Sequence, residues 1–401
     1  MKPSLILSLF VILTLISAPN LSVAGRTGEK CPDENTLTRQ ARIALVEAQK
    51  LMGEEKIKEA KITLETFVRE YPEENHAYVA YTMAGIYLEQ GKMEAALAQY
   101  EKTIGFCPAY APAWQNIGKV CYDLGKYSRA ATALEKTWEL TGKENHALRF
   151  HAAAAYISAK APQKALTILE FLCSGQAGAP EENWVKLLVH LSIEQKTPGS
   201  AVKTVERLLA QPDPKPYLFL LATSLYLDMN LYKKAVQNLD AYGLIKSLTR
   251  AEQILLADLY NNLGIPARAA ENYEKSLALE PSQKIHERMA TAWFDACEYE
   301  TALAAAKQGL TTYPDSYALW KLVGWIHYEA KAFVPAAEAF HQASTLDPKD
   351  AKSLFMYGLC SCRAGDNESA RKALQQAACN VNYKDRAMGL IRQMEAAAEK
   401  I

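Results

Sequence analysis

Ten alanines recur along the chain at a nearly constant interval of 33 to 36 residues. These ladder alanines are Ala60, Ala96, Ala130, Ala165, Ala201, Ala235, Ala269, Ala302, Ala336 and Ala370. A period near 34 is typical of stacked copies of one small unit, because a unit of this length cannot bury its own apolar face. The chain is therefore expected to form a solenoid, not a globule around one central core.

The residues around each ladder alanine alternate in size in a fixed way. Twelve positions earlier stands a mostly small residue: Ala48, Ala84, Gly118, Ala153, Val189, Thr223, Ala257, Ala290, Gly324 and Gly358. Four positions later stands a large apolar residue in nine copies: Leu64, Tyr100, Leu134, Leu169, Val205, Leu239, Tyr273, Phe340 and Leu374. The spacing of four puts the alanine and the large residue on one helical face. Each copy is therefore expected to contain two helices that cross closely where small faces large.

One copy of the repeat matches a known family pattern almost completely. It reads Trp320, Val323, Gly324 and His327, followed by Ala336, Phe340 and Pro348. The chain thus resembles the tetratricopeptide repeat (TPR) family, with pattern W-x2-L-G-x2-Y, A-x3-F and P, except that His327 replaces the tyrosine. The resemblance implies an all-α, right-handed superhelical solenoid of about ten helix-turn-helix repeats over residues 41–382. In this family the first helices line a concave groove.

Two segments interrupt the repeat near its middle. Residues 173–183 contain Gly175, Gly178 and Pro180, and residues 211–216 contain three prolines. Each segment is either a hinge that divides the array or a longer loop. We favour loops, because both segments are short.

The two ends of the chain differ from the repeats. Residues 1–24 have a basic start, an apolar run and small residues at Ser22 and Ala24, which predicts a secretory signal peptide cleaved after Ala24. Residues 25–40 form a lead-in, and residues 383–401 predict an amphipathic capping helix. The mature protein is expected to be periplasmic or secreted and to have no integral membrane span, since about 14 apolar-rich residues are too few to cross a bilayer. Retention of the segment as an anchor is the alternative.

Charge and motif content exclude several classes of function. The chain has 45 basic and 45 acidic residues, so it lacks the positive field that nucleic acid binding requires. The sequence contains no recognised metalloprotease, haem, hydrolase or phosphate-loop motif, and we expect neither enzymatic activity nor a cofactor or metal site.

Eight cysteines in an exported chain would ordinarily indicate disulfides. The repeat positions of most of them instead predict small core residues, because the expected distances within helix pairs are too long for bridges. Cys31 lies outside the repeats and is expected to be free or to form an intermolecular bond.

The family groove positions in this chain hold aromatic residues interleaved with charges of both signs. The groove residues predicted from the resemblance are Tyr78, Tyr81, Tyr122, Phe150, Tyr217, Phe294, Trp325, Tyr328 and Phe355, with Lys119, Lys284 and Lys321 among the charges. Aromatic rings offer much contact area at little entropic cost, which suits burial of peptide side chains. Packing of single rings against the neighbouring repeat is the alternative interpretation.

The pattern as a whole predicts a non-catalytic scaffold of the cell envelope that binds segments of partner proteins in its groove. The alternative is an accessory subunit of an envelope enzyme or export complex that binds a glycan or small ligand. The identity of the partner is not encoded in the repeat.

Overall fold

The computed structural model describes Cys31 and residues 36–398, and every regular element in this part of the chain is a helix. The first helices of ten successive pairs are α1 (Arg39–Gly53), α3 (Ala77–Glu89), α5 (Ala111–Asp123), α7 (His146–Ser158), α9 (Glu182–Glu194), α11 (Tyr217–Asp228), α13 (Arg250–Asn262), α15 (Gln283–Asp295), α17 (Tyr317–Glu329) and α19 (Ala351–Ala364). The second helices are α2 (Ile57–Glu70), α4 (Met93–Phe106), α6 (Tyr127–Leu140), α8 (Pro162–Cys173), α10 (Gly199–Leu209), α12 (Tyr232–Ile245), α14 (Pro266–Leu279), α16 (Tyr299–Thr312), α18 (Phe333–Leu346) and α20 (Asn367–Ala377). A 3-10 turn (Pro72–Glu74) follows α2, and α21 (Lys384–Ala398) ends the chain.

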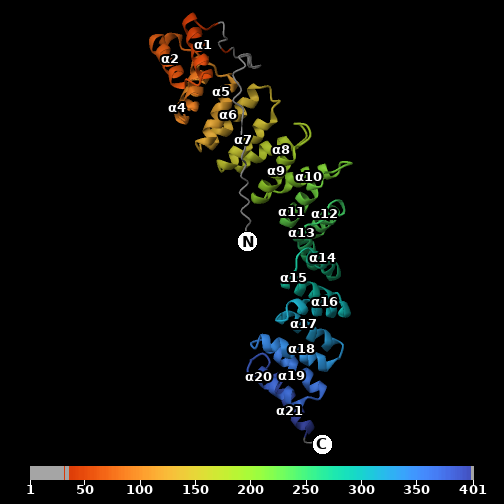
Figure 1. Ribbon diagram of the computed structural model, residues 1–401. Helices are drawn as coiled ribbons and strands as arrows, with labels where there is room; N and C mark the ends of the chain where they lie inside the picture. The colour runs from red at the N-terminus through yellow and green to blue at the C-terminus, as the bar shows by residue number, and fades with distance from the viewer. Residues whose placement is uncertain (1–30, 32–35, 399–401) are drawn as a thin grey trace. The chain divides into compact units, whose positions relative to one another are not determined.

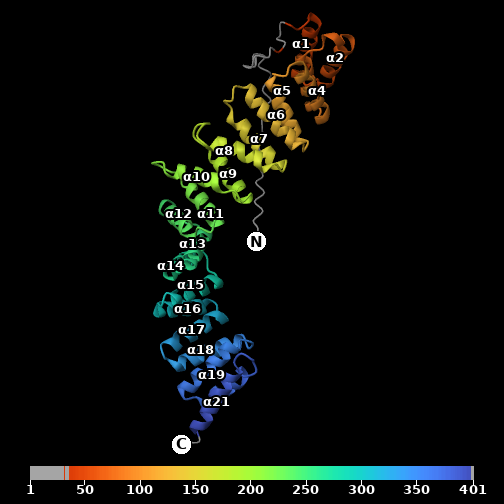
Figure 2. The ribbon, with the colours of Figure 1, turned by 180° about the vertical axis from the view of Figure 1, so that it is seen from behind.

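The helices form two compact units, residues 1–204 and residues 205–401, with the division inside α10. Within each unit, helices that follow one another in sequence lie side by side, as Figure 1 and the reverse view in Figure 2 show. The predicted all-α repeat fold is confirmed. The interrupting segments are irregular chain between α8 and α9 and between α10 and α11.

The ladder alanines form the centre of each helix pair. All ten have no exposed surface, and the large residues four positions later are also buried. The small residue twelve positions before the alanine faces that large residue: a Cβ atom on Gly324, for example, would lie 2.9 Å from ring atoms of Phe340. The predicted pairing of small and large residues at the helix crossings therefore holds.

Gly358 provides a test of this packing. A Cβ atom on Gly358 would lie 2.6 Å from Cγ of Leu374, whereas a Cβ on Gly85 in α3 would meet no atom within 4 Å. We expect Gly358→Ala to lower the free energy of unfolding by about 1 to 3 kcal/mol, because the crossing of α19 and α20 must open. Gly85→Ala should raise it by up to about 1 kcal/mol, since alanine is the better helix former. Urea denaturation of both variants measures the difference, and equal shifts would contradict the packing.

Tyrosines join successive repeats through a bond that the sequence pattern did not reveal. In four copies, the tyrosine nine positions before the ladder alanine donates a hydrogen bond from its hydroxyl to an acidic residue. That acidic residue lies five positions after the ladder alanine of the preceding copy. The four pairs are Tyr87 with Glu65, Tyr156 with Glu135, Tyr226 with Glu206 and Tyr260 with Asp240, at 3.3, 2.7, 2.6 and 2.5 Å. Each bond ties a first helix to the second helix of the repeat before it.

These bonds predict a loss of stability in alkali. Burial, together with the hydrogen bond to the acid, raises the pKa of Tyr226 and of Tyr260 to about 12, against an ordinary value of 10.0. Between pH 10 and pH 12 the unfolded chain therefore loses protons that the folded chain retains, so stability falls as the pH rises through this interval. We expect Tyr226→Phe combined with Tyr260→Phe to cost about 2 kcal/mol at pH 7 and to flatten the alkaline decline. Melting curves from pH 7 to pH 12 measure both effects; an unchanged alkaline slope would contradict the assignment.

The cysteine prediction was wrong in two respects. Cys31 is neither free nor intermolecular, because it forms a disulfide with Cys107 at the end of α4, with Cα atoms 5.0 Å apart. Of the six cysteines outside this bond, Cys121, Cys173 and Cys360 are buried, Cys362 is half-buried, and Cys297 and Cys379 are exposed. Cys31 lies outside the repeats, so distances within helix pairs do not apply to it, and it packs beside the junction of α4 and α5.

The last helix covers the end of the second unit. Ala387 and Ile391 of α21 are buried against Leu374 and Ala377 of α20, with Leu390 and Met394 beside them. The apolar stripe predicted for a capping helix thus faces the last repeat.

Candidate functional site

Three of the predicted groove aromatics gather in the second unit. Trp325 and Tyr328 on α17 and Phe355 on α19 pack together against a core cluster that includes the fully buried Phe340. The Trp325 ring meets Phe340 edge to face with centroids 5.5 Å apart, and the Lys352 ammonium lies over the Trp325 ring at 4.7 Å. All three aromatics are half-buried. They therefore contribute to repeat packing as well as to the surface.

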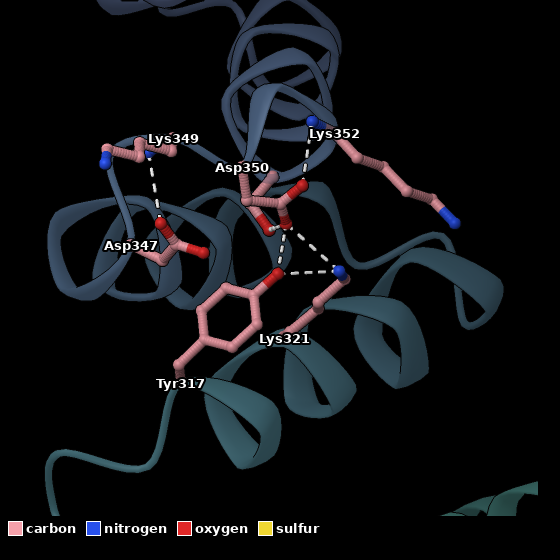
Figure 3. Close-up of polar contacts among 7 residues, drawn as sticks. Tyr317, Lys321, Asp347, Lys349, Asp350 and Lys352 are labelled. Carbon is pink, nitrogen blue, oxygen red and sulfur yellow. Dashed lines mark hydrogen bonds and ion pairs between the residues drawn. The ribbon is translucent and has the colours of Figure 1, made fainter.

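Lys321, another predicted groove residue, belongs to a polar network between α17 and α19. Its Nζ donates to the Tyr317 hydroxyl at 2.7 Å and to Oδ2 of Asp350 at 3.0 Å (Figure 3). The same carboxylate accepts hydrogen bonds from Tyr317 and, at 2.7 Å, from Ser353. This network joins two successive first helices and leaves Lys321 committed to internal partners.

The network fixes the charge of Asp350. Burial alone would raise the pKa of this carboxyl, but hydrogen bonds from Ser353, Tyr317 and Lys321 outweigh burial and hold the pKa well below its ordinary value. Burial and the bond to Asp350 raise the pKa of Tyr317. The network is therefore ionised at Asp350 and neutral at Tyr317 at neutral pH.

Two more predicted groove residues meet in the first unit. Tyr78 and Tyr81 of α3 each contact the Tyr110 ring, with centroids 5.7 and 5.2 Å away. The Tyr81 hydroxyl accepts a hydrogen bond of 3.0 Å from Asn116 of α5, which also donates to Tyr100. These rings bridge successive first helices, as the packing alternative proposed.

The remaining predicted residues are not brought together. Tyr122 lies against Tyr127 and is 41% exposed, Phe150 lies against His151, and Phe294 lies against Tyr299. Tyr217 begins α11 and is half-buried, and Lys119 and Lys284 are exposed on α5 and α15. Tyr122, Phe150 and Phe294 therefore each contact a ring close by in sequence.

The hollow at groove positions of the second unit is polar. Its volume is about 540 Å³, and it is lined by Asp258, Asn261, Asn262, Tyr273, Glu287, Arg288, Thr291 and Ala318. Arg288 binds Asp258 through Nη1 at 2.8 and 3.1 Å, and Asp258 also accepts a hydrogen bond from Tyr273. The exposed amides of Asn261 and Asn262 line the same hollow as this pair of Arg288 and Asp258. Asn261 occupies the repeat position that holds Tyr122, Phe294 and Tyr328 in other copies. The aromatic pattern of the groove positions therefore does not indicate this hollow.

Two findings on the described residues concern membrane insertion and metal binding. None of the helices there is both long enough and apolar enough to cross a membrane. Nor do His, Cys, Asp and Glu side chains in that part of the chain form a group of three or more that could hold a metal ion.

Two segments of this chain match models of protein families. Residues 85–125 match a "TPR repeat" model, and residues 335–387 match a "Tetratricopeptide repeat" model. The matches support the tetratricopeptide repeat family. The first segment contains α4 and α5, and the second contains most of α18 and all of α19 and α20; the same helical unit recurs between them in the structure.

The individual proteins and solved structures to which the chain is similar are distant from it in sequence. The chain is 21% identical over 317 residues to the "BBSome complex member BBS4 homolog" of Drosophila melanogaster, covering 76% of this chain and 64% of that protein. A tetratricopeptide repeat protein from Parabacteroides merdae has 13% identity and a TM-score of 0.34, over 64% of this chain and 99% of its own. MamA from Desulfovibrio magneticus, residues 41 to the end, has 19% identity and a TM-score of 0.35, over 42% and 95%.

Proposed function

We propose that this chain is a non-catalytic protein-interaction scaffold that is exported and acts in the cell envelope. The observation that supports binding best is the polar hollow in the second unit. Its walls come from three successive first helices, α13, α15 and α17, and from Tyr273 of α14. A hollow that crosses several helices suits an extended polypeptide segment better than a compact ligand.

The chemistry of the hollow fits a peptide backbone. Asn261 and Asn262 offer amide groups that both donate and accept hydrogen bonds, as a peptide bond does. Arg288 and Asp258 are paired, so a peptide that enters meets no unpaired charge from these two groups. The rings near the C-terminus are less suited to a glycan, since Lys352 lies over the Trp325 ring and Trp325 packs on Phe340.

The disulfide supports export. Cys31–Cys107 joins residues 76 positions apart, and such bonds persist in oxidising compartments such as the periplasm or the outside of the cell. The proposed signal peptide, residues 1–24, lies outside the described residues and stays a prediction.

The test is to express the full chain in a host that exports it and to capture its partners from the envelope fraction. The proposal expects a mature mass that begins at Gly25 and specific proteins that co-purify with the wild type but not with an Asn261→Ala, Asn262→Ala variant. Retention of residues 1–24 in the membrane fraction would indicate an anchor. Equal capture by wild type and variant would remove the hollow as the binding site.

A further inference from the structure

Rings and cations cluster at the loop edge of the first unit, where α6, α7, α8 and α9 meet. The members of this Arg149 cluster are Trp138, His146, Arg149, Phe171 and Trp184. The rings of Trp138, His146 and Phe171 have centroids 5.9 to 6.3 Å apart. They build a compact frame around one arginine.

The frame holds the Arg149 guanidinium by its faces. The carbon Cζ lies 4.4 Å from the Trp138 ring centroid and 4.5 Å from that of Phe171. The Lys143 ammonium lies 5.5 Å from the same Trp138 ring, which places a second cation nearby. Stacking of this kind fixes the plane of a guanidinium, and its N–H groups lie in that plane.

The polar atoms of the cluster lack partners. Nε of Arg149, Nε1 of Trp138 and Nδ1 of His146 are buried, and none has a hydrogen-bond partner among the described residues. The guanidinium as a whole forms no hydrogen bond or ion pair in that part of the chain. Buried donors are nearly always paired in folded proteins, so the two unpaired donors, Nε of Arg149 and Nε1 of Trp138, indicate an acceptor from outside.

Equivalent positions in two other repeats show what is missing. Trp114 and Trp320 occupy the position of Arg149, and their indole N–H groups donate to the carbonyl oxygens of Pro108 and Pro314 at 2.7 and 2.8 Å. The residue that corresponds to these prolines before Arg149 is Lys143. Nε of Arg149 forms no hydrogen bond to the carbonyl oxygen of Lys143, so the internal bond of the other two repeats is absent here.

Nearby acids are already engaged. Glu135 accepts the Tyr156 hydroxyl at 2.7 Å, and Glu139 pairs with Lys136 at 3.6 Å. Burial lowers the pKa of Arg149, and these two carboxylates only partly offset that effect. The cluster therefore retains capacity for one more negative charge.

We propose that the Arg149 cluster binds the carboxylate of an aspartate or glutamate side chain in a partner polypeptide. A guanidinium presents parallel N–H groups that match the two oxygens of a carboxylate, and the Trp138 indole can add a third donor. Arg149 stands 16 residues before its ladder alanine, whereas the groove positions stand 18, 15, 11, 8 and 7 before theirs. The cluster is thus a second contact surface, and it does not depend on the groove being a binding site.

The test uses the full mature chain and three fluorescent decapeptides that are identical except at four positions and at the C-terminus. The first has four glutamates and an amidated C-terminus, and the second has four glutamines and an amidated C-terminus. The third has the four glutamines and a free C-terminal carboxylate. Fluorescence polarisation should detect binding of the glutamate peptide at least tenfold tighter than of the amidated glutamine peptide. Binding of the third peptide as tight as the first would assign the site to chain termini and overturn the side-chain proposal. Arg149→Lys keeps the positive charge but loses the parallel N–H groups of the guanidinium, and it should weaken binding of the glutamate peptide at least tenfold. Arg69→Lys, an exposed arginine of the same unit, should leave binding unchanged.

A second readout protects the test against loss of folding in the variant. The indole N–H resonance of Trp138 in the wild type, assigned with Trp138→Phe, should shift when the glutamate peptide is added and not when the glutamine peptide is added. The Asn261→Ala, Asn262→Ala variant should bind the glutamate peptide normally, which separates this site from the groove. Equal binding of glutamate and glutamine peptides, or a folded Arg149→Lys variant that binds as the wild type does, would overturn the proposal.

Discussion

Replacing Cys31 and Cys107 together by serine is expected to lower the free energy of unfolding of the first unit by about 2 to 4 kcal/mol. The bond closes a loop across 76 positions, and long loops lose the most entropy when they are closed in the unfolded chain. Cys107 is buried, and Cys31 packs against Ala109, Ala111 and Leu140, so the bond holds Cys31 against an apolar cluster beside the junction of α4 and α5. Urea denaturation of the oxidised wild type and the double variant measures the loss.

Cys379→Ser is the matched control, because Cys379 is exposed and forms no disulfide. It should change stability by less than about 0.5 kcal/mol. Alkylation of the unfolded protein without reductant should modify six of the eight cysteines, leaving the two that form the bond. Modification of all eight would show that the bond is absent and would also withdraw its support for export.

The repeat architecture could be predicted from the sequence because it depends on local spacing. A residue with no exposed surface at every ladder position, such as Ala60 or Ala336, is required by the close approach of two helices within one copy. Spacing within a copy therefore gives the core directly. It gives the capping helix for the same reason, since Ala387 and Ile391 repeat at a helical interval.

Contacts between copies were harder to predict, because they depend on which side chains meet across 20 to 35 residues. Family positions placed Trp325 and Lys321 at the groove, but the structure joins Lys321 to Asp350 and packs Trp325 on Phe340. The bonds from Tyr226 to Glu206 and from Arg288 to Asp258 follow a repeat register that becomes visible only when the ladder is used to align copies. The disulfide involves Cys31, which lies outside that register altogether.

The difference between side chains that pack in the core and side chains that are exposed decides how the groove is best tested. Truncating Trp325 and Tyr328 would remove contacts with the buried Phe340 and with Phe333, so loss of binding would be mixed with loss of folding. Asn261 and Asn262 are exposed and lie in the hollow, so their side chains can be shortened with little effect on the core.

We therefore expect Asn261→Ala combined with Asn262→Ala to weaken binding of a captured partner protein about thirtyfold, with the melting temperature unchanged. Each amide can contribute about 1 kcal/mol through hydrogen bonds to a peptide backbone, and about 2 kcal/mol corresponds to this factor. Asn238→Ala is the matched control, because Asn238 lies on the second helix α12 and bonds the carbonyl oxygen of Lys234. Titration of the captured partner against the three proteins gives the affinities. A double variant that folds and binds as tightly as the control would place the partner on another surface, because the only change it carries is the loss of amides from the hollow.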